Sequence, residues 1–256
     1  MKRTENFDKF IDELDEQNYF MLEEEIDIDI QNKYFKHSRK LANSVTKNDV
    51  MNDVPSLTDL DVPIEVKKNI LAQLASLQDV EAFRILEKNC RQFDDEELNT
   101  WSILAYNESK MILNGSLKNE QQVFISTGLG GKDGKFRYFV VMLPHEDVVE
   151  FSSFQKDFIN NELEFTLKQN QASLEKIIES TDDYISYKIL IPIKTNVPKL
   201  FKEVIKNCNQ LSPFVSNQFI ITNVSEMNKE EIYDFVKDLD DDDDDNSIVE
   251  DIVSMN

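Results

Sequence analysis

Glycine is concentrated in one place in this chain. Four of the five glycines, Gly128, Gly130, Gly131 and Gly134, fall in one short loop of the stretch 121–144, QQVFISTGLGGKDGKFRYFVVMLP. The runs on either side, Gln121 to Thr127 and Phe136 to Leu143, are rich in the Val, Ile, Phe and Tyr residues that favour strands. Because Asp133-Gly134 is a common hairpin dipeptide, we predict a β-hairpin with these runs as its strands and a glycine-rich tip.

Three amphipathic helical patterns precede the hairpin. They cover residues 64–77, 80–93 and 98–113, each with apolar side chains at helical spacing. Pro63 suits a first helical turn, Asp79 begins the second pattern, and Asn114-Gly115 is typical of a helix end. The sequence therefore predicts a helical layer before the hairpin.

Residues 57–117 resemble the HEAT-like class of α-helical repeats. The likeness rests on small and aliphatic residues at characteristic spacings: Pro63, Val66, Leu71, Leu74, Ala75, Leu77, Asp79, Ala82 and Leu86, then Leu98, Trp101, Leu104, Ala105, Glu108, Ser109 and Leu113. It covers under two repeats, whereas such repeats need about three units to share a core. The resemblance implies a helical layer that presents a protein-binding face, and it implies no catalytic residues.

Strands and helices alternate after the hairpin. We predict a helix over 147–179, a strand over 184–193, a helix over 197–210, a strand over 218–224 and a helix over 228–237. This ββαβαβα order indicates an α+β fold, with a two-layer sheet of about four strands and helices on one face. The expected divisions are an acidic segment with short helices (1–50), the helical region (57–117), the α+β domain (121–237) and an acidic disordered tail (238–256).

Charge is distributed unevenly along the 256 residues. The net charge is −22, of which residues 1–31 carry −8 and residues 226–256 carry −11. The nearly neutral body lacks the broad basic surface that grips phosphates, so we expect no direct nucleic-acid partner and no membrane partner. No long apolar segment and no signal-peptide pattern is present, which predicts a cytoplasmic protein, and Cys90 and Cys208 are expected to be buried, reduced thiols.

Both acidic ends contain short apolar patterns. A helix is expected over Glu5 to Glu16, and the alternation around Ile26, Ile28 and Ile30 fits either an edge strand or an extended acidic linker. Six aspartates, Asp240–Asp245, predict a disordered connector. Beyond it, one helical face would hold Ile248, Val249, Ile252 and Val253. Both isoleucine-rich patterns are candidate partner-binding segments, and the alternative for the last is an end without a role.

The glycine loop is the candidate ligand site. Its backbone N–H groups could converge on an anion, and its lysines would supply charge, so the candidate residues are Gly128, Gly130, Gly131, Lys132, Gly134 and Lys135. The loop lacks the Ser or Thr and the helix of a phosphate-binding P-loop, which favours a structural hairpin tip. No catalytic motif or metal-ligand spacing occurs around His37, His145 or the cysteines, so no catalytic residue, metal or cofactor is predicted.

Two classes of function remain open. We favour a non-enzymatic protein–protein interaction or adaptor protein, because the recognisable short patterns lie in the ends and the body lacks catalytic motifs. The alternative is a nucleotide- or phosphate-binding enzyme that uses residues 128–135. A lesser alternative is a mimic of nucleic acid, in which the acidic ends occupy a basic site on another protein.

Overall fold

In a computed structural model, the chain divides into two compact units. The structure describes residues 19–41, 46–118, 122–148, 150–241, 248–250 and 254–255. Within those limits, one unit holds residues 19–22, 26–125 and 254–255, and we name it the helical unit. The other holds residues 23–25 and 126–250, and we name it the sheet unit.

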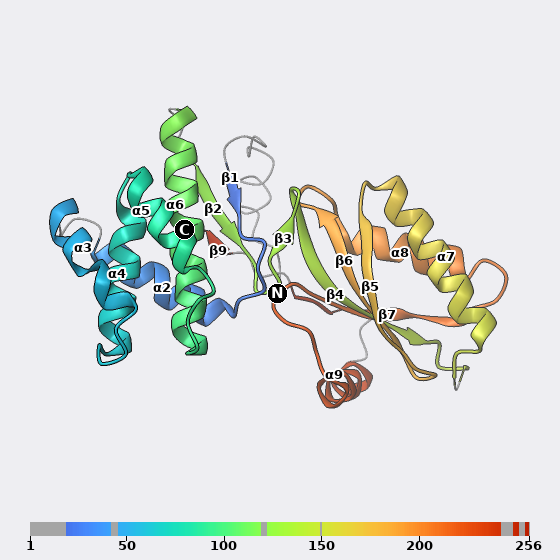
Figure 1. The fold of residues 1–256 in the computed structure, drawn as a ribbon. Coiled ribbons are helices and arrows are strands. Elements are labelled where there is room, and N and C mark those ends of the chain that lie inside the picture. Colours follow the sequence, from blue (N-terminus) through green and yellow to red (C-terminus); the bar gives the residue numbers. More distant parts are fainter. Residues whose placement is uncertain are drawn as a thin grey trace. The chain divides into compact units, whose positions relative to one another are not determined.

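The helical unit is built from helices around one hydrophobic core, with a small sheet beside them (Figure 1). The core includes Tyr34, Leu71 and Trp101. Strands β1 and β2 pair in parallel, and β9 completes the order β1-β2-β9. The elements are β1 (Tyr19–Met21), α2 (Ile28–Leu41), α3 (Lys47–Asp53), η1 (Val54–Leu57), α4 (Ile64–Ser76), α5 (Val80–Asn89), α6 (Glu96–Lys118), β2 (Val123–Ser126) and β9 (Ser254–Met255).

The three predicted amphipathic helices form as α4, α5 and α6. Asp79 caps α5, because its carboxylate accepts the backbone N–H groups of Glu81 and Ala82 at 2.9 and 3.1 Å. The predicted end at Asn114-Gly115 is wrong, since α6 continues to Lys118 with Gly115 buried inside it. The resemblance to HEAT-like repeats stays a prediction.

The sheet unit contains the larger sheet. Its strands follow the order β5-β6-β4-β7-β8, with β3 beside β4. The elements are β3 (Gly131–Lys132), β4 (Lys135–Pro144), α7 (Ser153–Gln169), β5 (Ser173–Ser180), β6 (Ile185–Pro192), α8 (Val197–Cys208), β7 (Val215–Thr222), α9 (Lys229–Asp241) and β8 (Ile248–Glu250).

The order β4-α7-β5-β6-α8-β7 is a βαββαβ unit. Its four strands pair antiparallel, with β4 and β6 in the centre. This is the ferredoxin-like arrangement, in which each βαβ half is split by a strand of the other. The predicted α+β class is confirmed, and so is the expectation of about four principal strands.

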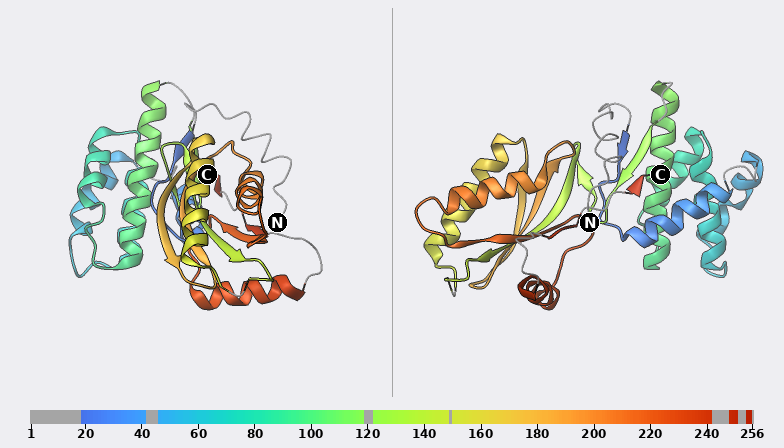
Figure 2. Two further views of the ribbon diagram at one scale, coloured as in Figure 1. Left: turned by 90° about the vertical axis from the view of Figure 1, so that its right-hand side faces the viewer. Right: turned by 180° about the vertical axis from the view of Figure 1, so that it is seen from behind.

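Helices cover both faces of this sheet (Figure 1, Figure 2). Side chains alternate along a strand, so Val140 and Phe139 of β4 face opposite sides. Tyr187, opposite Val140, bonds through its hydroxyl to Asn160 of α7 at 2.8 Å. Phe139 instead shares a core cluster with Ile232 of α9. The expectation of helices on one face therefore holds for α7 and α8 but not for α9.

The hairpin differs from the prediction. Strand β2 pairs with β1, and β4 pairs with β6 and β7, so the described part of the predicted first strand, residues 122–127, is not the partner of residues 136–143. The hairpin is the much shorter pair β3–β4, closed by Asp133 and Gly134 with φ of 50° and 73°. Positive φ at both central residues is the turn that Asp-Gly favours, so the turn was identified correctly and its first strand was not.

The predicted long helix over 147–179 is also wrong in part. A capping box between Ser152 and Gln155 begins α7, and Asn170 ends it. Gln171 then adopts φ of 56°, a left-handed conformation that reverses the chain. Residues 173–180 form β5, which pairs with β6. Strand β5 thus supplies the fourth principal strand of the sheet, beside β6 and not beside β4.

The segment around Ile28 is a helix rather than an edge strand. Asp27 accepts the N–H groups of Asp29 and Ile30 at 2.8 and 3.2 Å, and α2 begins at Ile28. Ile26 is buried, and Ile30 packs against the core of the helical unit. An aspartate inside the alternating pattern therefore acts as a helix cap, which explains why the strand prediction fails.

The C-terminal patterns change as well. Helix α9 extends past Lys237 to Asp241, and Ile248–Glu250 form β8, parallel to β7, instead of a helix. The predictions for residues 5–16, for Asp242–Asp245 and for Ile252 and Val253 lie outside the described residues.

Cys90 and Cys208 are both free thiols. Cys208 is buried, as expected, and this burial raises its pKa to about 12. Cys90 is only half-buried, which differs from the prediction. Within the described ranges, every helix is too short or too polar to cross a membrane.

Candidate functional site

The glycine loop packs closely against two distant backbone segments. A Cβ atom on Gly128 would lie 1.8 Å from the carbonyl oxygen of Val224. Gly130 has φ of 67°, and a Cβ atom there would lie 2.5 Å from the carbonyl oxygen of Glu24. Only glycine allows such approaches without moving one of the backbones. The packing explains two of the four clustered glycines, and the Asp133-Gly134 turn explains a third.

The loop's polar groups are largely used inside the protein. The N–H of Leu129 donates to Asn223 at 2.9 Å, and the N–H of Gly130 donates to Thr127 at 3.2 Å. The Thr127 hydroxyl in turn donates to the carbonyl of Gly130 at 2.9 Å. An anion site would need such N–H groups free, so this geometry favours a structural role. Lys132 is exposed and opposes the half-buried Lys135 across the hairpin. A ligand site at residues 128–135 stays a prediction.

A charged cluster lies beside the loop, within the sheet unit. Arg137 holds Glu175 through Nε at 2.5 Å and Nη2 at 3.2 Å, and its Nη1 donates to the carbonyls of Leu129 and Glu23. Lys188 pairs with Glu25 at 2.7 Å and with Glu226. Burial alone would lower the pKa of Lys188, but its bonds to these two carboxylates outweigh burial and raise the pKa. Because both cations are neutralised, the cluster fastens residues 23–25 to the sheet.

A second polar cluster is buried in the helical unit. The Tyr34 hydroxyl donates to Glu108 at 2.6 Å, and the Ser38 hydroxyl lies 2.9 Å from both carboxylate oxygens. Burial raises the pKa of Glu108, and burial together with the Glu108 charge raises the pKa of Tyr34. Glu108 thus receives the hydrogen bonds that a buried carboxylate needs, which identifies it as a satisfied core group. In the described part of the chain, no three His, Cys, Asp or Glu side chains gather as they would around a metal ion.

Helix α7 exposes a stripe of phenylalanines. Phe154, Phe158 and Phe165 are 78%, 40% and 57% exposed. At 3.6 residues per turn these positions fall on one side of the helix, opposite the buried Ile159 and Leu163. The rings of Phe154 and Phe158 stack at 6.4 Å, and Phe158 meets the ring of Phe214 at 6.2 Å. We name Phe154, Phe158, Phe165 and Phe214 the aromatic stripe.

Acidic side chains border this stripe. Asp157 and Glu164 are exposed on α7, and Lys168, the exposed base near them, is paired with Glu164 at 3.2 Å. Leu211, in the loop that carries Phe214, is fully exposed. The surface is therefore apolar in its centre, with Asp157 and the Glu164–Lys168 ion pair at its edge.

The sequence contained a signal for the stripe. Residues 153–169 hold two apolar sets, one at 159, 163 and 167 and one at 154, 158 and 165. Either set alone would make an ordinary amphipathic helix, but both together leave one set uncovered. The single helix predicted over 147–179 contains both sets, so the exposed face was not recognised from the sequence.

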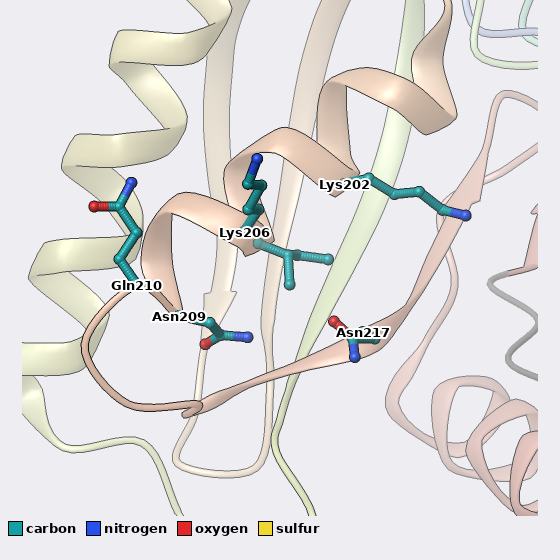
Figure 3. Close-up of a pocket in the computed structure, with 6 residues that line it drawn as sticks. Lys202, Lys206, Asn209, Gln210 and Asn217 are labelled. Carbon is teal, nitrogen blue, oxygen red and sulfur yellow. The ribbon is translucent and has the colours of Figure 1, made fainter.

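A pocket of about 520 Å³ opens between α8 and β7 (Figure 3). Lys202, Ile205 and Lys206 line it from the helix, and Asn217 faces them from the strand. The connecting loop supplies Asn209 and Gln210. The β4–β7 register shifts here: Met142 opposes Phe219 and Pro144 opposes Val215, so residues 216–218 bulge. This bulge places Asn217 out of the regular ladder, at the wall of the pocket.

The predicted partner-binding isoleucines lie elsewhere. Ile26 is buried and Ile30 packs on the core, which leaves Ile28 half-buried on α2. Ile248 and Val249 oppose Ile220 and Ile221 in the ladder of β7 and β8. Partner binding by these segments stays a prediction.

Comparisons with known proteins give little support for any activity. No protein-family model and no curated protein matches the sequence. Among solved structures, the chain is similar to the crystal structure of a putative transposase from Deinococcus radiodurans R1, at 14% identity and a TM-score of 0.35. That match covers 42% of this chain and 93% of the other. At this TM-score the likeness carries no argument about fold or function.

Proposed function

We propose that this chain is a protein-interaction module whose sheet unit binds an amphipathic helix of a partner protein along the aromatic stripe. The observation that carries the proposal is the exposure of Phe154, Phe158 and Phe165 on the face of α7 opposite its buried side. Scattered exposed apolar residues are ordinary, but several exposed aromatic residues on one side of a helix are typical of an interaction site.

The size of the stripe fits a helix of about three turns. From Phe154 to Phe165, α7 rises about 16 Å at 1.5 Å per residue. Large aromatic side chains each bury roughly 150 to 250 Å² when covered, and they are frequent energetic centres of interfaces. A partner helix with apolar residues at every third or fourth position would cover the row.

Charge selects the kind of partner. The stripe is bordered by Asp157 and by the Glu164–Lys168 ion pair, and the whole chain carries −22. A second copy would bring the same border and the same net charge against this surface. A partner helix with Lys or Arg beside its apolar face would instead find opposite charges. The proposal therefore commits to a basic amphipathic helix from another protein.

The test uses synthetic helical peptides of 17 residues with one apolar face. One has Lys and the other Glu beside that face. We expect the full-length protein to bind the Lys-flanked peptide, measured by fluorescence polarisation, and to bind the Glu-flanked peptide at least tenfold more weakly. Replacing Phe154, Phe158 and Phe165 by Ser should weaken binding of the Lys-flanked peptide at least tenfold, because truncating central aromatic contacts usually costs more than 1 kcal/mol each.

A matched control separates the stripe from general surface apolarity. Leu60, Val80 and Leu117 of the helical unit are 94%, 58% and 85% exposed, and replacing all three by Ser should leave peptide binding unchanged. Equal loss in both triple variants contradicts the proposal. Sedimentation that gives a dimer for the native protein and a monomer for the stripe variant would assign the surface to a second copy instead.

A further inference from the structure

The pocket between α8 and β7 brings two unpaired lysines together. Lys202 and Lys206 lie one helical turn apart and are both exposed. No carboxylate of the described residues pairs with either ammonium, whereas Lys47, Lys68 and Lys188 all have acidic partners. Like charges at this spacing repel each other, so the pair favours an added anion.

Amide groups complete the wall. Asn217 faces the helix from the bulge of β7, and no side-chain bond engages it within the described residues. Gln210 makes one long bond to Asn207 at 3.4 Å, which leaves donor capacity on its amide. Asn209 is different, because its amide already holds Phe214 and Val215 at 2.7 to 3.0 Å. The loop that shapes the pocket is thus fixed, while the Asn217 amide, which faces the helix that carries the lysines, remains available.

The remaining lining is apolar. Ile205, which lies between the two lysines in the sequence, is 3% exposed and lines the pocket. A volume of about 520 Å³ lies within the range of small-molecule sites, which is roughly 300 to 1,000 Å³. Lysine ammoniums are compact point charges that suit phosphate oxygens. A ligand with a charged end and an apolar body would use every part of this wall.

We propose that this pocket binds a phosphate-bearing small molecule, with Lys202 and Lys206 neutralising the phosphate and Asn217 donating a hydrogen bond to it. The site is distinct from the glycine loop and from the aromatic stripe.

The experiment titrates full-length protein with pyrophosphate at constant ionic strength, using calorimetry. We expect saturable binding to the native protein. Replacing both Lys202 and Lys206 by Ala should weaken binding at least tenfold, since charge-assisted hydrogen bonds contribute more than neutral ones. Asn217→Asp keeps the size of the side chain but places a carboxylate opposite the lysines, and it should weaken binding by a similar factor.

The matched control removes the same charge from the glycine loop. Replacing Lys132 and Lys135 by Ala should leave pyrophosphate binding within twofold of native. If both double variants lose pyrophosphate affinity equally, net charge alone explains the effect, and the proposal is overturned. Loss only in the loop variant would move the site to residues 128–135. Absence of saturable binding to the native protein would also overturn it, and peptide binding to the aromatic stripe is measured independently of all these outcomes.

Discussion

At the scale of single residues, the clustered glycines act through contacts that are remote in sequence. Gly128 meets the backbone of Val224, and Gly130 meets that of Glu23 and Glu24. A sequence pattern reports turn preference, which is local, and it identified the Asp133-Gly134 turn correctly. A local pattern does not indicate which backbone segment packs against the loop when that segment is remote in the sequence. Two of the four glycines therefore had no explanation before the structure.

Gly128→Ala should destabilise the sheet unit by more than about 3 kcal/mol, because a Cβ atom 1.8 Å from the Val224 carbonyl oxygen forces two backbone segments apart. Urea unfolding followed by far-UV circular dichroism measures the change. Gly134→Asn is the matched control: its φ of 73° is one that Asn tolerates, so the loss should stay below about 1 kcal/mol. Similar losses in the two variants would contradict the role of close packing at Gly128.

At the scale of elements, prediction succeeded where periodicity is clear. Helices α4, α5 and α6 all have apolar residues at helical spacing, and all three form, although α4 follows Pro63 without a side-chain cap. Strand β5 was missed because its sequence, SLEKIIES, follows α7 with neither Gly nor Pro between them. The chain reverses instead at Gln171, directly after Asn170, in a left-handed conformation that is uncommon for residues other than glycine.

The functional surfaces were harder to predict than the elements. Exposure of Phe154 depends on which face of α7 the sheet covers, and the pocket depends on a bulge at residues 216–218. Both follow from tertiary packing, which overrides local pattern. The glycine loop was predicted as a site because its composition is unusual, and its composition is largely accounted for by packing.

The cap of α5 offers a prediction at this scale. Asp79→Ala should destabilise the helical unit by about 1 kcal/mol, because it removes the acceptor of two backbone N–H groups. Asp79→Asn keeps that acceptor and loses only the partly exposed ion pair with Lys47, so its effect should be at most a few tenths of a kcal/mol. Urea midpoints from tryptophan fluorescence measure both variants, and equal losses would assign the stability to the ion pair instead of the cap.

At the scale of the whole molecule, the two units have separate hydrophobic clusters. The core of the helical unit contains Trp101, the chain's one tryptophan, at 5% exposure. A cluster of the sheet unit contains Phe139, Val141 and Ile220 instead. Tryptophan fluorescence therefore reports the helical unit, whereas far-UV circular dichroism reports both units.

We expect the two units to unfold independently in urea, so that the fluorescence and dichroism transitions do not coincide. Coincident transitions are the mark of a single cooperative unit, and separate cores predict their absence. Gly128→Ala acts on the sheet unit. It should therefore lower the urea midpoint of the dichroism transition that occurs without a change in tryptophan fluorescence. Asp79→Ala should lower the fluorescence midpoint and leave the other part unchanged. If either substitution lowers the fluorescence and dichroism midpoints by the same amount, the two units unfold in one cooperative transition, and the prediction is contradicted.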